Sequence, residues 1–241
     1  MSRALLSYEM IALVKATSMR ARLRAEMTDE IKAIARRHLA TDGANLSLRA
    51  VARDLGVVSS AIYRYFPSRD DLLTALILDA YNALGESVEA AEAAVARDDL
   101  TGRFLAVCHA VRGWGLANPH EYALIYGSPV PGYAAPVDTV AAATRSVVVL
   151  GSILQDGAVA GVFPADQGDF PPPVAADLAR MAAAIAPAVP HAALARGMGS
   201  WLHLFGFVSF ELFGQLNNAV DEPGPFFEVQ MRAQAAYIGL P

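Results

Sequence analysis

Cysteine is nearly absent from this 241-residue chain, because Cys108 is its single cysteine. An internal disulfide and a metal centre built from several thiolates are therefore excluded. A chain without disulfides is typical of a reducing compartment, so a cytoplasmic protein is expected. Charged residues are sparse, at 18%, whereas hydrophobic residues reach 54%. This balance excludes an intrinsically disordered chain and supplies enough apolar side chains for a sizeable core.

A long uninterrupted hydrophobic run is also missing. The most apolar stretch, 201–213, contains His203 and Glu211 and is too short to cross a bilayer, so no membrane partner is expected. Residues 1–14 hold one basic residue and no long apolar run, so no signal peptide is expected. Met19 is an alternative starting point, which would make residues 1–18 an upstream leader.

The usual signal for a β-hairpin is lacking, since no Asn-Gly or Asp-Gly turn joins two alternating apolar runs. Alanine dominates the apolar residues and favours helix, which predicts an all-α chain. Beyond residue 95, the helices are expected at 101–117, 119–126, 136–159, 174–186, 190–217 and 223–238. Loops rich in Pro and Gly separate them.

Charge is divided unevenly along the chain. Residues 1–72 carry 12 Lys and Arg against 8 Asp and Glu, a net charge of +4, whereas residues 73–241 carry 7 against 16, a net charge of −9. A basic amino-terminal part on an acidic remainder is typical of a localised DNA-binding surface, although chance segregation of surface charge gives the same pattern. Arg20, Arg22 and Arg24 form a short basic arm, which either reaches the DNA minor groove or remains a solvated tail.

Four helices are predicted within residues 28–95. The first begins at Thr28, which is a suitable N-cap, and ends at Gly43. The second runs from the N-cap Ser47 to Gly56, and a third, short helix runs from Ser59 or Ser60 to Tyr65. The fourth begins at Ser68, with Asp71 placed as in a capping box, and extends to about Val95. The apolar stripes of the first two helices are Ile31, Ile34, Ala35 and Leu39, and Leu48, Val51, Ala52 and Leu55.

The second and third helices have the form of a helix-turn-helix, in which a glycine allows the tight turn and the second helix enters the major groove. Packing is assigned to Ala52, Leu55, Val57 and Ile62, which leaves the other side chains of the third helix facing outward. Hydroxyl groups bind phosphates, and arginine binds phosphates or a guanine edge. The outward residues are Ser59, Ser60, Tyr63, Arg64 and Tyr65. Ser47 adds a helix amino terminus that can hold a phosphate.

These segments closely resemble the signature of the tetracycline-repressor (TetR) family. The resemblance is carried by residues 48–57 (LRAVARDLGV), 60–66 (SAIYRYF) and 68–73 (SRDDLL). It implies a DNA-binding domain over residues 25–72 after an extension at 1–24, with the helix-turn-helix at Ser47–Phe66. It also implies that Ser47 and Arg49 contact the DNA backbone and that Arg69 binds a phosphate. Tyr65 is a departure, since histidine is frequent there, but it keeps a ring and a donor.

Residues 73–241 resemble the effector-binding and dimerisation domain of one TetR subgroup, which contains a Trp-His-Gly motif. The matching segments are 201–207 (WLHLFGF) and 118–127 (NPHEYALIYG). The resemblance implies a homodimer that binds double-stranded operator DNA and is released from a palindromic operator by a small-molecule effector. The aromatic, acidic character of this part favours an apolar or a cationic effector.

Aromatic side chains in the carboxy-terminal part are candidates for an effector pocket. The same spacing is typical of plain core packing, and both interpretations stay open. The candidates are Trp114, Tyr122, Tyr126, Trp201, Phe205 and Phe210.

The last two predicted helices are apolar on more than one face. This predicts that they form a four-helix bundle with a second copy, the alternative being deep burial within one chain. The interface candidates are Leu194, Leu202, Phe213 and Leu216.

Catalytic and metal-binding patterns are not found in the sequence. The four histidines after residue 100 lack metal-ligand spacing, and no phosphate loop or Gly-x-Ser-x-Gly motif occurs. Cys108 and His109 are adjacent, but neighbours on a helix point about 100° apart and do not share a proton readily. No cofactor is expected. The alternatives to a regulator are a small-molecule-binding protein with a degenerate DNA-binding unit and an enzyme that uses the carboxy-terminal cavity.

Overall fold

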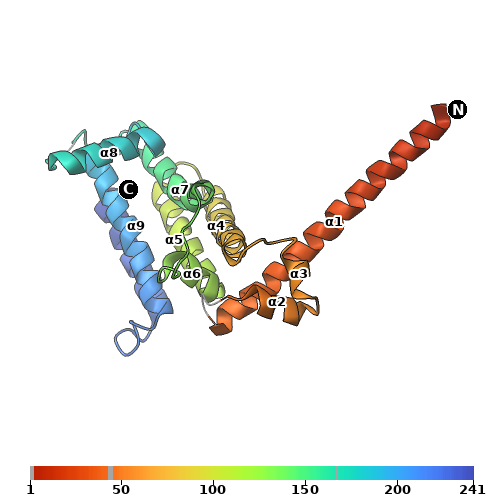
Figure 1. Cartoon of the computed structure of the whole chain (residues 1–241). Helices are drawn as coiled ribbons and strands as arrows, with labels where there is room; N and C mark the ends of the chain where they lie inside the picture. The colour runs from red at the N-terminus through yellow and green to blue at the C-terminus, as the bar shows by residue number, and fades with distance from the viewer. Residues whose placement is uncertain (1–2, 43–45, 167) are drawn as a thin grey trace. The chain divides into compact units, whose positions relative to one another are not determined.

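The computed structural model describes residues 3–42, 46–166 and 168–241, and every regular element in them is helical. Two compact units are formed (Figure 1). The amino-terminal unit is Met1–Leu76 with Val130–Tyr133, and the carboxy-terminal unit is Ile77–Pro129 with Ala134–Pro241. The first four helices are α1 (Arg3–Asp42), α2 (Leu48–Leu55), α3 (Ser59–Ile62) and α4 (Arg69–Ala93).

The later helices agree with the predicted spans to within two residues, apart from two. They are α5 (Leu100–Ala117), α6 (Pro119–Tyr126), the short 3₁₀ helix η1 (Val137–Thr139), α7 (Val140–Val159), α8 (Pro172–Ile185), α9 (His191–Leu212) and α10 (Pro223–Ile238). The helix expected at 136–159 begins as η1, so its α-helical part, α7, starts at Val140. The other exception is α9, which was expected to reach residue 217. It ends earlier because Gly214 adopts a left-handed φ of 79° and turns follow it.

The prediction that the first helix begins at Thr28 is wrong, since α1 begins at Arg3. No glycine or proline occurs between residues 3 and 42, so nothing in the sequence interrupts the helix before Thr28. The Thr28 hydroxyl donates to the Arg24 carbonyl 2.9 Å away, a bond within the helix and not a cap. The cap predicted at Gly43 lies outside the described residues.

The core of the amino-terminal unit forms from the predicted stripes. Ile31 and Ala35 on α1 are fully buried, as are Val51 and Ala52 on α2. Leu55 is half-buried and contributes less than expected. Figure 1 shows α2 and α3 lying beside the carboxy-terminal half of α1. Burial of these side chains supplies most of the stability of such short helices, because elements of this length are marginal in water on their own.

In the carboxy-terminal unit, α5 packs on α7, α9 and α10, and α9 packs on both α8 and α10. Phe104, Cys108 and Val111 of α5 lie in a single apolar core with Phe227 and Met231 of α10. The burial of Cys108 raises the pKa of its thiol above the ordinary range, so this thiol stays protonated.

Two arginines hold α4 against its neighbours. Arg145 of α7 donates to both carboxylate oxygens of Glu89, at 2.9 and 2.7 Å, and to the Asn82 side chain at 2.9 Å. Arg103 of α5 is fully buried and donates to Glu92 at 2.6 Å. Arg145 and Arg103 with these three α4 residues are called the α4 clamp below.

The α4 clamp is closely packed, and its arginines are paired with carboxylates. A Cβ atom at Gly85 of α4 would lie 2.8 Å from Arg145 Nε, so a glycine is required for the arginine to cross α4. The hydrogen bond from Arg145 holds the pKa of Glu89 below its usual range. Arg103 also donates to Asp156 of α7 at 2.8 Å, and therefore joins α4, α5 and α7.

Among the described residues, Val137–Val159 is the one helical segment that is long and apolar enough to cross a membrane. The sequence instead indicated 201–213 as the most apolar stretch. Its length and composition are also those of a core helix: 44% of the most apolar window is buried, and Arg145 within it is ion-paired with Glu89 at 2.7 Å.

Gly56 provides a test of the turn after α2. It has a φ of 74°, where a Cβ-bearing residue is strained, although an added Cβ would meet nothing within 4 Å. Gly56→Ala is expected to destabilise the protein by about 1 kcal/mol in urea unfolding followed by circular dichroism. Gly113→Ala on α5 is the matched control, since its Cβ also meets open space without a positive φ. Equal effects of the two substitutions would contradict a backbone constraint at Gly56.

Candidate functional site

Hydrogen bonds cap both ends of α2 and fix the turn that leads into α3. The Ser47 side chain accepts a hydrogen bond from the Ala50 backbone N–H at 3.4 Å, as predicted for an N-cap. At the other end, the Gly56 and Val57 N–H groups donate to carbonyls of the last turn of α2, at 3.1 and 3.0 Å. Val58 then precedes α3 in an extended conformation. The path of the chain is therefore fixed by backbone hydrogen bonds.

The third helix is shorter than predicted. Regular α-helix ends at Ile62, and the chain continues through Tyr65 in tight turns, with Tyr65 N–H donating to the Ile62 carbonyl at 2.9 Å. Ile62 is fully buried and Phe66 is 6% exposed, so these two side chains anchor the segment. Ser59, Ser60, Tyr63 and Arg64 are exposed as a consequence. Residues Ser59–Tyr65 are called the recognition segment below.

Tyr65 lies differently from the other residues of the recognition segment. It is half-buried, and the Arg24 guanidinium lies 5.1 Å from the centre of its ring. Arg24 also donates to the Arg64 carbonyl at 3.0 Å. These contacts attach the recognition segment to α1.

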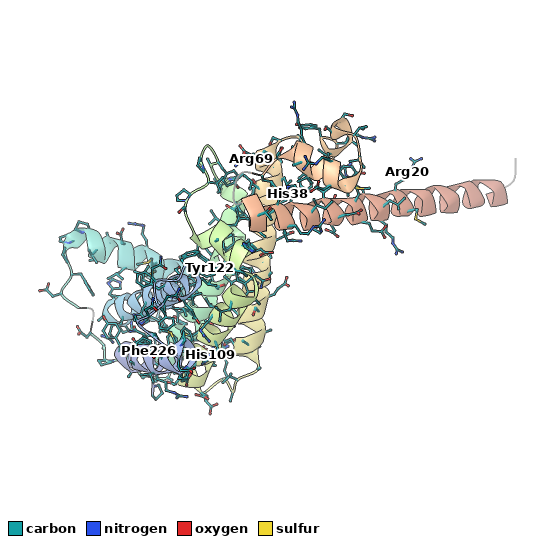
Figure 2. The ribbon with its side chains drawn as sticks, turned by 90° about the horizontal axis from the view of Figure 1, so that it is seen from below. Arg20, His38, Arg69, His109, Tyr122 and Phe226 are labelled. Atoms are coloured by element: carbon teal, nitrogen blue, oxygen red, sulfur yellow. The ribbon has the colours of Figure 1, made fainter. Side chains whose placement is uncertain are left out.

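The basic arm predicted before the first helix is instead part of α1. Arg20, labelled in Figure 2, lies on this helix, and Arg22 pairs with Glu26 at 2.8 Å. Arg24 is bonded to the recognition segment, whereas Arg20 and Arg22 are exposed on the surface of α1. The arginines are therefore carried by a helix and not by an irregular tail, and contact of Arg20 and Arg22 with the minor groove stays a prediction.

His38 and Asp54 form a contact that the sequence did not indicate. His38 Nε2 lies 2.6 Å from Asp54 Oδ2, joining α1 to α2, and His38 is 9% exposed. This hydrogen bond lowers the pKa of the Asp54 carboxyl, and the neighbouring Arg53 lowers it further. The two residues are 16 positions apart on different helices, so no spacing rule links them. Figure 2 shows His38 on the half of α1 that carries the rest of the amino-terminal unit.

The start of α4 carries the predicted capping box and the predicted phosphate ligand. Ser68 Oγ accepts from the Asp71 N–H at 3.1 Å and donates to the Asp71 carboxylate at 2.7 Å. Arg69 is partly exposed and lies 3.6 Å from Asp70. Its charge is therefore already partly balanced within the chain.

Exposed cations on α2 add to the predicted surface. Arg49 is exposed, as is Arg53, which was not predicted and lies one helical turn further on. Residues four apart share a helix face, so the i, i+4 spacing of these two arginines was a usable signal. Arg53 contacts Asp54 at 3.3 Å.

The aromatic candidates for an effector pocket separate into three groups. Tyr122 is fully buried and donates to the Phe205 carbonyl at 3.1 Å, and its burial raises the pKa of the phenol to about 12. Tyr126 and Phe205 pack in the same cluster, with ring centres 4.4 Å apart, and Trp114 is half-buried against the core. Trp201 lines a small cavity, whereas Phe210 is 55% exposed at the surface. Figure 2 shows Tyr122 among the helices of the carboxy-terminal unit.

The interface candidates also separate. Leu202 and Phe213 are 66% and 44% exposed, whereas Leu194 is buried within its own chain. Leu216 lines an open groove of about 310 Å³ together with Phe207, Phe210 and Phe226, the last of which is labelled in Figure 2. His203 and Gln230 also line this groove, which lies between α9 and α10.

Catalytic and metal-binding arrangements do not occur among the described residues. No group of three or more His, Cys, Asp and Glu side chains in those residues is placed to hold a metal ion. Cys108 is buried, while the neighbouring His109 points to Glu228, with Nε2 and Oε2 2.6 Å apart. The two side chains therefore do not form a pair.

Known proteins share both parts of this arrangement. The family described as "Bacterial regulatory proteins, tetR family" matches residues 31–76. The family described as "Tetracyclin repressor-like, C-terminal domain" matches residues 104–234. This chain belongs to the TetR family of transcriptional regulators. The resemblance to the TetR family inferred from the sequence motifs is thereby confirmed, whereas the subgroup with the Trp-His-Gly motif stays a prediction. A TetR-family regulator is a DNA-binding protein with a helix-turn-helix.

Individual relatives of this TetR-family regulator match over most of its length. The HTH-type transcriptional regulator Rv1816 of Mycobacterium tuberculosis (strain ATCC 25618 / H37Rv) is 37% identical over 218 residues, which cover 89% of this chain and 93% of the relative. The crystal structure of the regulatory protein SCO4313 is 34% identical with a TM-score of 0.72, covering 90% of this chain and 98% of that one. A tetR-family regulatory protein from Rhodococcus RHA1, at 16% identity and a TM-score of 0.60, shares the fold.

Arg64 and Tyr63 provide the test of the recognition segment. Arg64→Ala and Tyr63→Ala are each expected to weaken binding to the operator by about 1–3 kcal/mol, because each removes an exposed hydrogen-bond donor of the kind that DNA phosphates and base edges accept. Titration of labelled operator DNA at several salt concentrations measures this. If Arg64 binds a phosphate, its loss reduces the salt slope by about 1.

Arg180→Ala is the control for the loss of one positive charge. Arg180 is exposed on α8, pairs with Asp177 on the same helix and is distant in sequence from the recognition segment. Operator affinity is expected to stay unchanged in this variant. Unchanged affinity in Arg64→Ala and Tyr63→Ala as well would contradict the assignment of the recognition segment.

Proposed function

We propose that this TetR-family protein is a homodimeric repressor that leaves a palindromic operator when a small-molecule effector binds. The exposed set Ser59, Ser60, Tyr63 and Arg64, fixed from beneath by buried Ile62 and Phe66, carries this proposal. It offers hydroxyl, phenol and guanidinium donors on one rigid surface, which is the chemistry that DNA phosphates and base edges accept. Ser47, Arg49 and Arg69 provide further backbone contacts in this proposal.

Dimerisation is supported by the surface of α9 and α10. Three large apolar side chains of α9 or the turn after it, Leu202, Phe210 and Phe213, are 66%, 55% and 44% exposed, and Val229 of α10 is 62% exposed. Large apolar side chains exposed on two packed helices are typical of an interaction surface. A second copy is the partner proposed, because one recognition segment per subunit reads one half of a palindrome.

The charges of α9 support the same partner. Its two permanently charged residues are Arg196 and Glu211, and both are engaged inside the chain. Arg196 donates to the Ile238 carbonyl at 3.2 Å, and Glu211 accepts two hydrogen bonds from Arg112 at 2.8 and 2.6 Å. The outward face of α9 therefore presents no repulsive charge to an identical face, as a two-fold contact requires.

The connection between effector and DNA is assigned to α4. This helix begins three residues after Phe66, and its later part is held by the α4 clamp. An effector that displaces α5 or α7 acts on α4 through Arg103 and Arg145. Operator affinity then changes by the difference between the effector affinities of the two conformations.

A small-molecule-binding protein with an inactive DNA-binding unit is the alternative. Sequence-specific DNA binding that weakens as salt rises separates the two, since an inactive unit shows neither property.

Leu202→Asp tests the dimer surface. It places a charge on a side chain that is 66% exposed, so the fold of the subunit is expected to survive. Burying that unpaired charge in an interface is costly, and the dimer is expected to dissociate at least about 100-fold more readily. Sedimentation or light scattering should give a mass near the 25.5 kDa of one chain in place of twice that value.

Val159→Asp is the matched control, because Val159 is 75% exposed and lies on α7. It is expected to leave the mass at two chains. A Leu202→Asp protein that still has the mass of two chains would show that the outward face of α9 is not the interface.

A further inference from the structure

A small cavity lies where α7, α8 and α9 meet. Its volume is about 20 Å³, and every side chain that lines it is apolar or is the indole of Trp201. Leu154 comes from α7, Met181 and Ile185 come from α8, and Met198 comes from α9. A buried water needs two to four polar partners, which this lining does not supply. The cavity is therefore a dry gap in the packing.

The helices around this cavity pack closely at glycines. A Cβ atom at Gly197 of α9 would lie 2.6 Å from Leu154 Cδ1, and one at Gly151 of α7 would lie 3.3 Å from Ile185. Met181 and Met198 are unbranched and flexible, so they adapt to the shape of whatever lies beside them. The cavity can enlarge by rotation of side chains and by a small shift of α8.

The helix α8 is held to its neighbouring helices mainly by apolar packing. Its charged residues Asp177 and Arg180 pair with each other on the exposed side. Among the described residues, no side chain of α8 forms a hydrogen bond or ion pair with another helix. Leu178 and Ala182 hold it by apolar packing, and the Ala188 N–H donates to Gln155 just beyond its end. A helix held in this way can move outward without breaking an ion pair.

Both walls of the cavity lead to α4. On the α9 side, Trp201 contacts Phe205 with ring centres 4.8 Å apart, Phe205 contacts Tyr126 at 4.4 Å, and Tyr126 contacts Tyr81 of α4 at 6.1 Å. On the α7 side, Arg145 precedes the cavity-lining residues on the same helix and binds Glu89 of α4. Occupation of the cavity therefore acts on two helices that each contact α4 directly or through one ring cluster.

We propose that this cavity is the closed form of the effector site and that it takes an uncharged, apolar small molecule. The proposal rests on the proposed function, because it names the class of effector for that regulator. A charged group would have no partner in the lining and would lose its hydration, so a cationic effector does not fit here. An apolar molecule replaces the empty gap with contacts and moves α8 outward.

Two probes with one aromatic skeleton test the proposed class of ligand. N-phenyl-1-naphthylamine is uncharged, and 1-anilinonaphthalene-8-sulfonate adds a sulfonate. In a Trp114→Phe protein, Trp201 is the single tryptophan, so quenching of its emission reports a probe in the cavity. The uncharged probe is expected to bind saturably and at least about tenfold more tightly than the sulfonate. Equal affinities would overturn the proposed ligand class.

Gly197→Ala tests the location of the site. The added methyl group pushes Leu154 into the cavity and is expected to lower the affinity for the uncharged probe by about tenfold or more. Gly199→Ala is the matched control on the same helix, since its Cβ meets only Tyr237, at 3.8 Å, and binding should stay within about twofold. If Gly197→Ala binds the probe as tightly as the wild type does, the probe lies elsewhere, as in the groove between α9 and α10. That result would overturn the proposed location of the effector site.

Circular dichroism checks that Gly197→Ala folds, and Gly151→Ala, with its milder 3.3 Å contact, replaces it if it does not. The probe titrations contain no DNA, so they are independent of operator binding. If the probe binds in the cavity but the protein binds no operator, the proposed repressor function is refuted and the proposed effector site is supported. If the protein binds operator but the probe does not bind in the cavity, the proposed effector site is refuted and the DNA-binding function is supported.

Discussion

The continuity of α4 is the constraint on which the function of the rest depends. This helix begins at Arg69, directly after the recognition segment, and runs without a break to Ala93. Its first part, as far as Leu76, belongs to the same compact unit as α2 and α3, and its later part is bonded to Arg103 and Arg145. Bending a hydrogen-bonded helix has a cost in backbone hydrogen bonds. In the proposed mechanism, a change at the α4 clamp is therefore transmitted along α4 toward the recognition segment.

Periodicity in the sequence was sufficient for most of the fold. Ile31, Ile34, Ala35 and Leu39 are all buried as their spacing predicts, and most of the later helices end within two residues of the expected positions. Thr28 is a good cap residue and therefore predicts a helix start. No helix breaker precedes it, so α1 begins at Arg3 instead. A favourable cap residue does not begin a helix when the preceding residues are equally helical.

Contacts between distant charged residues could not be predicted. His38 with Asp54, and Arg145 with Glu89, join separate helices at sequence separations of 16 and 56 residues. A single sequence contains no periodic signal for such pairs. The aromatic residues were ambiguous for a different reason, since one helical spacing suits a core, a cavity wall and an outer surface alike. The structure separates Tyr122 in the core, Trp201 at the cavity and Phe210 at the surface.

The free energy that the Arg145–Glu89 ion pair of the α4 clamp contributes is small enough for a regulated contact. Arg145 and Glu89 are 26% and 44% exposed, and ion pairs with that degree of solvent access contribute about 1 kcal/mol or less. The coupling free energy between an effector and a second ligand is typically about 1–3 kcal/mol. In the proposed mechanism, an effector therefore loosens this pair with part of its own binding free energy. Arg103 is fully buried, and loss of its partners would be more costly, so the proposal assigns the movement to α7 and Arg145.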